Sequence, residues 1–238
     1  MMRSLAFSAI SLCLLLLCTT PSYADDELSE FQSKLTNEWT LVKNDRLRNI
    51  KTYAKQEDGR RFRSFKVEAT MNSTMETIAR VLLDFESYKK WWWEVRDVRL
   101  IRKDSPTEYF VYMVHRAPYG LPDRDVILHV VIEPQSKTQK FISLKVRANT
   151  ELLPLKPPLI RMEAEDMVVK FTPLPENRLL IEAQGYVDPG GRVPAWANNF
   201  IQRSAPYSIL LGLQRMAQLD EYRESHTALP FPIDSTPE

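Results

Sequence analysis

The clearest candidate for chemistry is the stretch "GYVDPGGRVPAWANNFI", residues 185–201, which holds three of the chain's six glycines. A glycine-rich turn between a strand and a helix can present backbone N–H groups to a phosphate. This turn carries Asp188 where a phosphate loop would carry a lysine, and no Walker-type spacing follows. The carboxylate would also compete with a phosphate for the same donors. We therefore interpret the stretch as a chain reversal, with Gly191 in the corner and Pro194 in the first turn of a helix.

Metal ligands and nucleophiles are few in this sequence. There are three histidines: His226 near the C-terminus, and His115 and His129 on expected strands. Both cysteines lie in the first 24 residues, and no HExxH pattern occurs. No serine stands in a nucleophile-elbow pattern. The sequence thus predicts no metal, no cofactor and no catalytic residue.

The carboxylates of "EAEDM", residues 163–167, are the closest approach to an acid/base pair. On a strand, Glu163 and Glu165 would share one face and Asp166 would point to the other. This spacing does not bring two carboxyl groups together for proton transfer. We interpret the segment as a solvated strand face.

The first 24 residues have the pattern of a secretory signal peptide that is cleaved after Ala24. Arg3 precedes an apolar run over 5–18, and Ser22 and Ala24 occupy the positions that a signal peptidase reads. Cleavage would remove both cysteines and one of the 32 basic residues. The mature chain would then carry 31 basic and 31 acidic residues, a net charge of zero. We expect a periplasmic or secreted protein without disulfides, and a neutral balance does not favour nucleic acid as a partner.

The hydrophobic pattern predicts an α+β protein. A polar helix is expected over 25–36, a second helix over 75–83 and a long one over about 194–223, and strands are expected at 39–45, 49–55, 62–71, 95–103, 108–116, 124–133, 139–149, 162–172 and 178–187. Runs of strands with helices at the ends favour one curved antiparallel sheet of about nine strands with helices on one face. We expect one domain, 25–228, and a loose proline-rich tail, 229–238.

Patterning leaves open whether the interior is filled or hollow. Strands 108–116 and 124–133 are apolar on both faces, which suits a buried core and a lipid-lined cavity equally. The last helix has a bulky stripe with Trp196 and Phe200 and a stripe of small residues beside it. Pro206 and Gly212 are costly within a helix. They fit either close packing of small residues on the sheet or a kinked lid helix that opens over a ligand.

Four motifs in this order resemble one family. They are "WTLVKNDRLRNIKTY", "DFESYKKWWWEVRDVRLI", "DRDVILHV" and "DPGGRVPAWANNFI". Together they resemble START (steroidogenic acute regulatory protein-related lipid transfer) domains over about residues 38–223. The resemblance implies a helix-grip fold, a curved antiparallel sheet around a long C-terminal helix. It also implies binding or transfer of one lipid or other hydrophobic molecule, usually without catalysis.

The resemblance places particular residues. It assigns Arg124 and Asp125 to a strand start, Asp188, Gly191 and Pro194 to the strand-to-helix corner, and loop 117–123 to the omega loop at the tunnel mouth. Steroid-binding members carry a buried acid–arginine pair in the tunnel, and the matching positions here look like Tyr112 and Val130. The tunnel would then be more apolar and the ligand class stays open.

The predicted ligand contacts come from four places on the chain. They are Tyr112 and Val114 on one strand, Leu128 and Val130 on the next, Tyr119 and Leu121 in the loop, and Trp196, Phe200 and Tyr207 on the last helix. We expect the loop and helix residues to gate the cavity.

Three further hypotheses remain at this point. A cyclase- or hydratase-like enzyme could work in the same cavity, which would need a polar pair such as Tyr112 with Arg124 or His115. The run Trp91, Trp92 and Trp93, beside several basic residues, could touch anionic lipid headgroups or bind an envelope protein. A monomer is expected.

Overall fold

The computed structural model describes residues 38–234, so the expected leader and first helix lie outside the described residues. The strands are β1 (Thr40–Asp45), β2 (Ile50–Lys55), β3 (Ser64–Asn72), β4 (Val95–Ser105), β5 (Glu108–His115), β6 (Arg124–Glu133), β7 (Ile142–Ala148), β8 (Ile160–Arg161), β9 (Ala164–Leu174) and β10 (Arg178–Asp188). The helices are α2 (Met75–Leu83), the 3-10 turn η1 (Phe85–Ser87), α3 (Tyr88–Trp91), α4 (Ala195–Met216) and α5 (Asp220–Arg223).

Nine strands form one antiparallel sheet in the order β1-β2-β3-β10-β9-β7-β6-β5-β4. The short β8 adds a parallel pairing to the start of β6. The first and last parts of the chain meet where β3 pairs with β10, from Ser64 opposite Tyr186 to Asn72 opposite Arg178. This confirms the α+β class and the curved helix-grip sheet that the pattern predicts.

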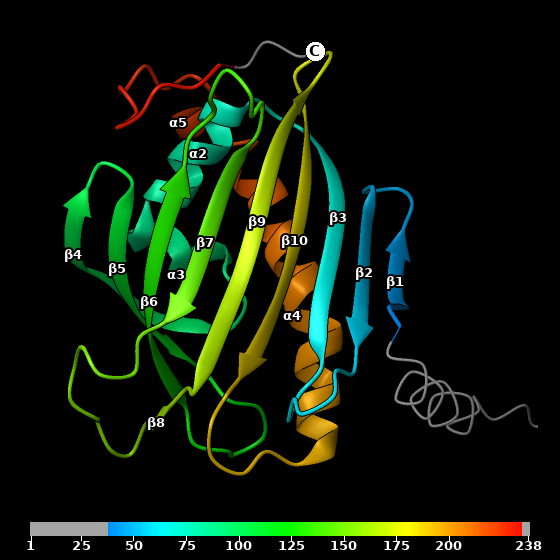
Figure 1. Cartoon of the computed structure of the whole chain (residues 1–238), viewed down its shortest axis with the longest axis vertical. Coiled ribbons are helices and arrows are strands. Elements are labelled where there is room, and N and C mark those ends of the chain that lie inside the picture. The colour runs from blue at the N-terminus through cyan, green and yellow to red at the C-terminus, as the bar shows by residue number, and fades with distance from the viewer. Residues whose placement is uncertain (1–37, 235–238) are drawn as a thin grey trace, which may run out of the picture.

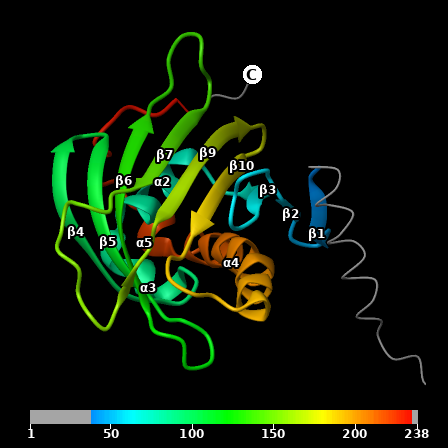
Figure 2. The same ribbon diagram turned by 60° about the horizontal axis from the view of Figure 1, so that its bottom comes forward.

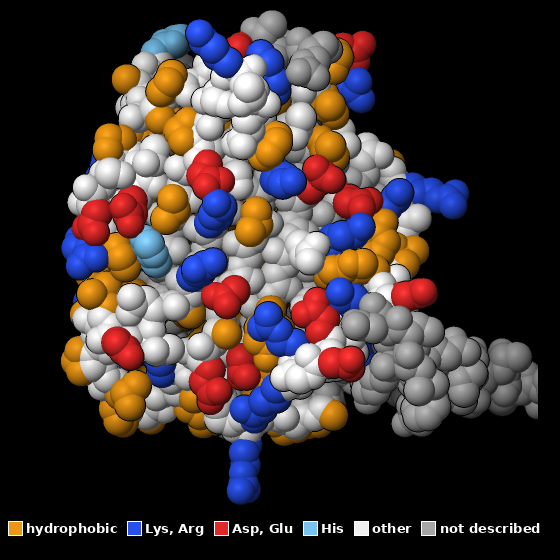
Figure 3. Space-filling view, in the orientation of Figure 1, with side chains coloured by type: hydrophobic (Ala, Val, Ile, Leu, Met, Phe, Trp, Pro, Cys, Tyr) orange, Lys and Arg blue, Asp and Glu red, His pale blue; other side chains and the backbone are white. Residues whose placement is uncertain are grey.

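The helices lie together on the concave face of the sheet, behind it in Figure 1. Figure 2 shows the sheet curving around α4, which runs beside β10 and β3. The opposite, convex face mixes acidic and basic side chains without a field of one sign (Figure 3). None of the helices within residues 38–234 combines the length and the apolar character needed to cross a membrane.

Thr74 caps α2, since its side chain accepts a hydrogen bond from Thr77 N at 3.2 Å. The start of α4 differs from the sequence-based expectation. Pro194 is the N-cap of α4, with extended ψ of 148°, and does not occupy the first helical turn. The long helix also ends earlier than expected, at Met216, before the short α5.

Gly212 has a packing role on α4. A Cβ at this position would lie 2.4 Å from the carbonyl oxygen of Trp91, so only glycine lets α4 approach the end of α3 this closely. The close approach at this point of the helix is therefore to α3, whereas the close-packing alternative placed the small residues on the sheet. α4 runs through Pro206 as one helix.

The proline-rich segment after residue 228 is packed on the domain as far as residue 234. Phe231 is buried in the main core. Asp234 N donates to Gln135 Oε1 at 2.8 Å, and Gln135 Nε2 donates to Asp234 O at 2.7 Å. The described part of the tail is therefore held in place, unlike the loose segment that its composition predicts.

A second apolar cluster lies on the convex face of β5 and β6. Phe110, Tyr112, Val114 and Ile127 are buried there under leucines of the segment between β7 and β8. Hydrogen bonds from Arg161 hold this covering segment in place. Its Nε and Nη2 donate to the two carboxylate oxygens of Asp125, each at 3.0 Å, and its guanidinium also donates to three backbone carbonyls, those of Thr150, Leu153 and Pro154.

Candidate functional site

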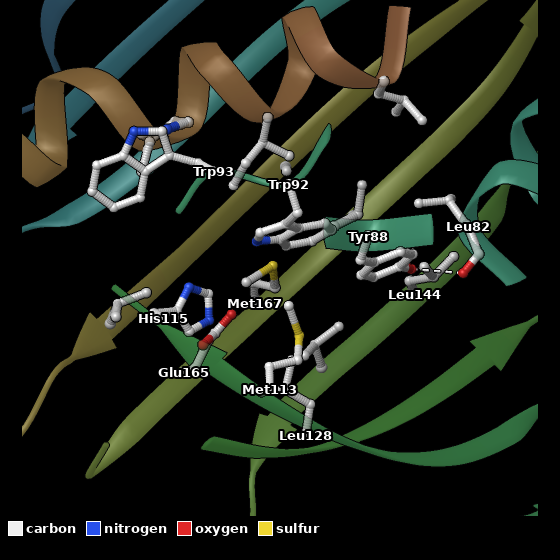
Figure 4. Close-up of a pocket in the computed structure, with 18 of the residues that line it drawn as sticks. Leu82, Tyr88, Trp92, Trp93, Met113, His115, Leu128, Leu144, Glu165 and Met167 are labelled. Carbon is white, nitrogen blue, oxygen red and sulfur yellow. Dashed lines mark hydrogen bonds between the residues drawn. The ribbon is translucent and has the colours of Figure 1, made fainter. Parts of the chain in front are cut away.

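A pocket of about 280 Å³ lies between the concave face of the sheet and the helices (Figure 4). Its walls come from β3, β5, β6, β7, β9 and β10, from α2 and α3, and from one face of α4. The α4 residues on this face follow a helical spacing: Asn198, Ile201, Gln202, Ala205, Pro206, Ile209, Leu210 and Leu213. Small side chains in the middle of that face leave the space that the pocket occupies.

One end of the pocket is lined by apolar and aromatic side chains. They are Phe85, Tyr109, Ile132, Ile142, Phe171, Leu213 and, from the tail, Phe231. Tyr109 directs its hydroxyl away, donating to Pro106 O at 2.5 Å. This end can hold a hydrocarbon chain, since every group that would touch it is apolar.

An aromatic layer from η1 and α3 forms a side wall. Tyr88 and Trp92 stack with ring centroids 5.1 Å apart and planes 8° apart, and Trp91 packs edge-on against Tyr88 at 5.0 Å. The Tyr88 hydroxyl donates to Leu82 O at 2.6 Å, and burial raises its pKa (Figure 4). Trp91 is buried in this wall, which contradicts the interfacial interpretation of that side chain. Trp92 is half-buried, and its contact with a membrane stays a prediction.

Polar side chains gather at the other end of the pocket. His115 closes β5 and Arg124 opens β6, and they are direct cross-strand partners. Glu165 comes from the start of β9, and Figure 4 shows its carboxyl beside the imidazole of His115. Gln202 reaches the same space from α4. Among the described residues, His115 Nε2, Arg124 Nε, Arg124 Nη2 and Gln202 Oε1 are shielded from solvent and have no hydrogen-bond partner.

Burial sets the protonation states at this polar end. It lowers the pKa of His115 to about 4, against a hydrogen bond with the Trp93 backbone that raises it, so the imidazole is neutral at pH 7. Burial, with a smaller contribution from the charge of Asp166, raises the pKa of Glu165 to about 7. The solvated face expected for residues 163–167 is thus wrong for Glu165, which is 4% exposed.

Replacing Glu165 should change how stability depends on pH. The Glu165 pKa is about 7 in the fold against 4.5 for a free side chain, so the native state holds the proton more tightly. The stability this gives is complete below pH 4.5 and is lost as pH rises through 7. Glu165→Gln should therefore be about 2–3 kcal/mol more stable than the unaltered protein at pH 8 and equally stable at pH 4.

Urea unfolding at pH 4, 6 and 8 measures this difference. Glu163→Gln, on an exposed side chain two residues earlier, is the matched control and should follow the unaltered protein throughout. A gain of equal size at all three pH values for Glu165→Gln would contradict the assignment of the shifted proton to this carboxyl.

Aromatic side chains form the rim beside the polar end. Tyr119 in loop 116–123 is 81% exposed, and its ring lies 5.3 Å from Trp196 and 6.3 Å from Phe200 at the start of α4. Phe200 also contacts Trp93 at 6.2 Å. These contacts join the loop to the helix beside the pocket residues Trp93, Pro118 and Leu121. Of the three consecutive tryptophans, only Trp93 reaches this rim, so membrane contact through it stays a prediction.

The predicted ligand contacts divide into three groups. Leu128, Val130 and Leu121 line the pocket. Tyr119, Trp196 and Phe200 form the rim described above. Tyr207 points away from the pocket, where its hydroxyl donates to Asp45 Oδ2 at 2.7 Å.

The prediction for Tyr112 and Val114 is wrong, because both lie on the convex face of β5. The register pairs Val111 with Leu128 and Tyr109 with Val130, so the pocket face of β5 carries Tyr109, Val111, Met113 and His115. Because this strand is apolar on both faces, its residue pattern does not show which face points into the pocket. Tyr112 thus cannot join Arg124 or His115 in a polar pair inside the pocket.

The corner residues carry the turn as expected. Asp188 Oδ1 accepts a hydrogen bond from Gly190 N at 2.9 Å, the geometry of a local turn. The Asp188 carboxylate therefore binds the backbone of its own turn. Gly190 and Gly191 both have positive φ, 67° and 61°. A Cβ on Gly190 would lie 2.5 Å from Arg161 O, so this corner packs directly on β8.

Sequence reasoning missed the polar end of the pocket. The alternation of side chains along the strands could have revealed it. Glu165 lies on the same strand face as Met167, Val169 and Phe171, and His115 lies on the same face as Met113. In the described part of the chain, no three His, Cys, Asp or Glu side chains are grouped to hold a metal ion.

Comparisons with known proteins agree on the fold. No model of a known protein family matches the chain. A STAR-related lipid transfer protein from Xanthomonas axonopodis superposes with a TM-score of 0.69 at 24% identity, over 76% of this chain and 99% of that one. Human STARD10 gives 0.67 at 21% identity, over 85% and 83%. Human StAR-related lipid transfer protein 5 gives 0.62 at 15% identity, over 82% and 92%.

The chain therefore has the fold of START domains, as its motifs predict. An uncharacterised protein of Pseudomonas aeruginosa is similar in sequence, 23% identical over 184 residues, which span 77% of this chain and 89% of that protein.

Proposed function

We propose that this protein binds one hydrophobic molecule, a lipid or lipid-like amphiphile, in the pocket between the sheet and α4. The observation that carries the proposal is the pocket's lining, which is apolar over most of its length and is framed by a fold shared with lipid transfer proteins. Burying apolar ligand surface there contributes about 25 cal/mol per Å² before ordering costs. In this proposal α4 is the wall that closes over the ligand.

Two features support α4 as the closing element. Its pocket face carries Ala205 and Pro206 in the middle, where bulk would fill the space. Its first turns bear Trp196 and Phe200, half-exposed at the rim against Tyr119 of the neighbouring loop. A shift of these rings would open the pocket from the polar end.

Purification of the native protein followed by lipid extraction and native mass spectrometry tests the proposal. We expect a co-purified hydrophobic molecule, or one-to-one uptake of Nile red, a neutral fluorescent hydrophobe, by delipidated protein. Absence of both would overturn the proposed function. Binding at a ratio well above one would instead indicate adsorption to the surface.

A further inference from the structure

The guanidinium of Arg124 has an unused donor edge inside the pocket. Arg124 is 5% exposed, and its Nη1 donates to Pro122 O. Its Nε and Nη2 are buried without a partner among the described residues. A buried cation and two unmade hydrogen bonds are both costly, so the site gains from any ligand group that supplies two acceptors and a negative charge.

Arg161 shows what this edge does elsewhere in the same protein. Its Nε and Nη2 bind the two oxygens of the Asp125 carboxylate, each at 3.0 Å. This is the parallel arrangement in which one edge of a guanidinium holds a carboxylate. Arg124 offers the same two atoms on the opposite face of the sheet, toward the pocket, and no protein carboxylate is paired with them.

Of the acidic groups near Arg124, Asp123 is engaged elsewhere and Glu165 is only partly ionised at pH 7. Asp123 accepts a hydrogen bond from Ala117 N at 3.1 Å and pairs with Arg96 on the outside. Glu165 is the acid inside the pocket, and burial raises its pKa to about 7. A carboxyl in contact with a cation would have its pKa lowered, so Glu165 does not compensate Arg124. In its protonated form it can donate a hydrogen bond.

The two ends of the pocket differ in polarity. Its polar side chains lie near strand ends and in the first half of α4, beside loop 116–123: Arg63, His115, Arg116, Arg124, Glu165, Asn198 and Gln202. Its opposite end, by Phe85 and Phe171, is apolar. A volume of about 280 Å³ is at the small end of ligand pockets, about 300–1,000 Å³, and favours one hydrocarbon chain.

We propose that the ligand is a single-chain carboxylic acid of fatty-acid type, with its carboxylate on the Nε–Nη2 edge of Arg124 and its chain toward Phe85 and Phe171. The proposal rests on the proposed function and adds a ligand class to it. The head group lies at the rim end, next to His115 and Glu165, and the chain fills the apolar end.

Displacement of Nile red by three probes with the same twelve-carbon chain tests this assignment. Dodecanoate should bind about 30-fold more tightly than dodecan-1-ol, the size of effect expected for charge-assisted hydrogen bonds to a buried cation. Dodecyl phosphate should bind more weakly than dodecanoate, because its head group carries a third oxygen and a larger charge that this edge leaves unpaired and that are costly to bury. A preference for the phosphate would overturn the carboxylate assignment.

Arg124→Gln should remove the preference for the acid, about a 30-fold loss for dodecanoate and less than threefold for dodecan-1-ol. Arg192→Gln removes an exposed positive charge from the corner before α4, at a residue that does not line the pocket, and should change neither probe by more than about threefold. Equal binding of acid and alcohol by the unaltered protein, or an equal loss of both in Arg124→Gln, would overturn the inference while leaving the proposed function intact. Failure of Nile red and every probe to bind would overturn both.

Discussion

Ala205→Trp is expected to fold normally and to bind Nile red or dodecanoate at least about tenfold more weakly than the unaltered protein. Ala205 lies in the middle of the α4 face that lines the pocket. An indole there would occupy space that the ligand chain needs, and each methylene group kept out of the pocket loses about 0.8 kcal/mol of burial. Two or three excluded methylenes therefore account for a loss of about 15-fold to 60-fold.

Fluorescence titration with Nile red, followed by dodecanoate displacement, measures this loss. Ser204→Trp is the matched control, because Ser204 precedes Ala205 on the same helix and is absent from the pocket lining. Its affinity should stay within about threefold of the unaltered protein. If Ala205→Trp binds as tightly as Ser204→Trp while both remain folded, the ligand lies somewhere other than this pocket.

Asp125→Ala should be the most damaging single change on the convex face, lowering the free energy of unfolding by about 3–5 kcal/mol. The side chains of Asp125 and Arg161 are 1% and 6% exposed, and their pair is bidentate. Removing the carboxylate leaves a buried guanidinium without its counter-charge. Arg161 also holds three carbonyls of the segment that covers Tyr112, so that cover should loosen as well.

Thermal and urea unfolding measure the effect, and a domain of this length should lose about 8–15 °C in melting temperature. Glu133→Ala is the control, because it breaks an ion pair with Lys145 in which both side chains are exposed by two fifths or more. That change should cost less than about 1 kcal/mol. A similar small cost for Asp125→Ala would show that water replaces the carboxylate around Arg161.

The sequence predicted the sheet well because the polar turns between strands are distinct and the strand periods are clear. It also placed Leu128 and Val130 on the pocket face correctly. It failed for the neighbouring strand, where Tyr112 and Val114 are as apolar as Val111 and Met113, because a segment 40 residues later covers the outer face. Only the pairing register, Val111 opposite Leu128, separates the two faces.

Polar pocket residues were harder to predict for another reason. Glu165 and Arg124 are buried because both line the pocket, which is enclosed by strands, helices and loop residues from distant parts of the chain. Charged residues near strand ends are usually solvated, so local sequence favoured the wrong environment for Glu165. The pairing of Arg161 with Asp125 joins residues 36 positions apart and is set by the parallel β6–β8 contact alone.

The close contact of Gly212 with the carbonyl of Trp91 fixes α4 against α3 near the C-terminal end of the helix. Seventeen residues separate Gly212 from Ala195 at the helix start, which is about 25 Å at 1.5 Å per residue. A tilt of about 10° around Gly212 would displace Ala195 by about 4 Å and Leu213 hardly at all. Such a tilt opens the rim by Trp196 and Phe200 widely, while the apolar end beside Leu213 stays covered.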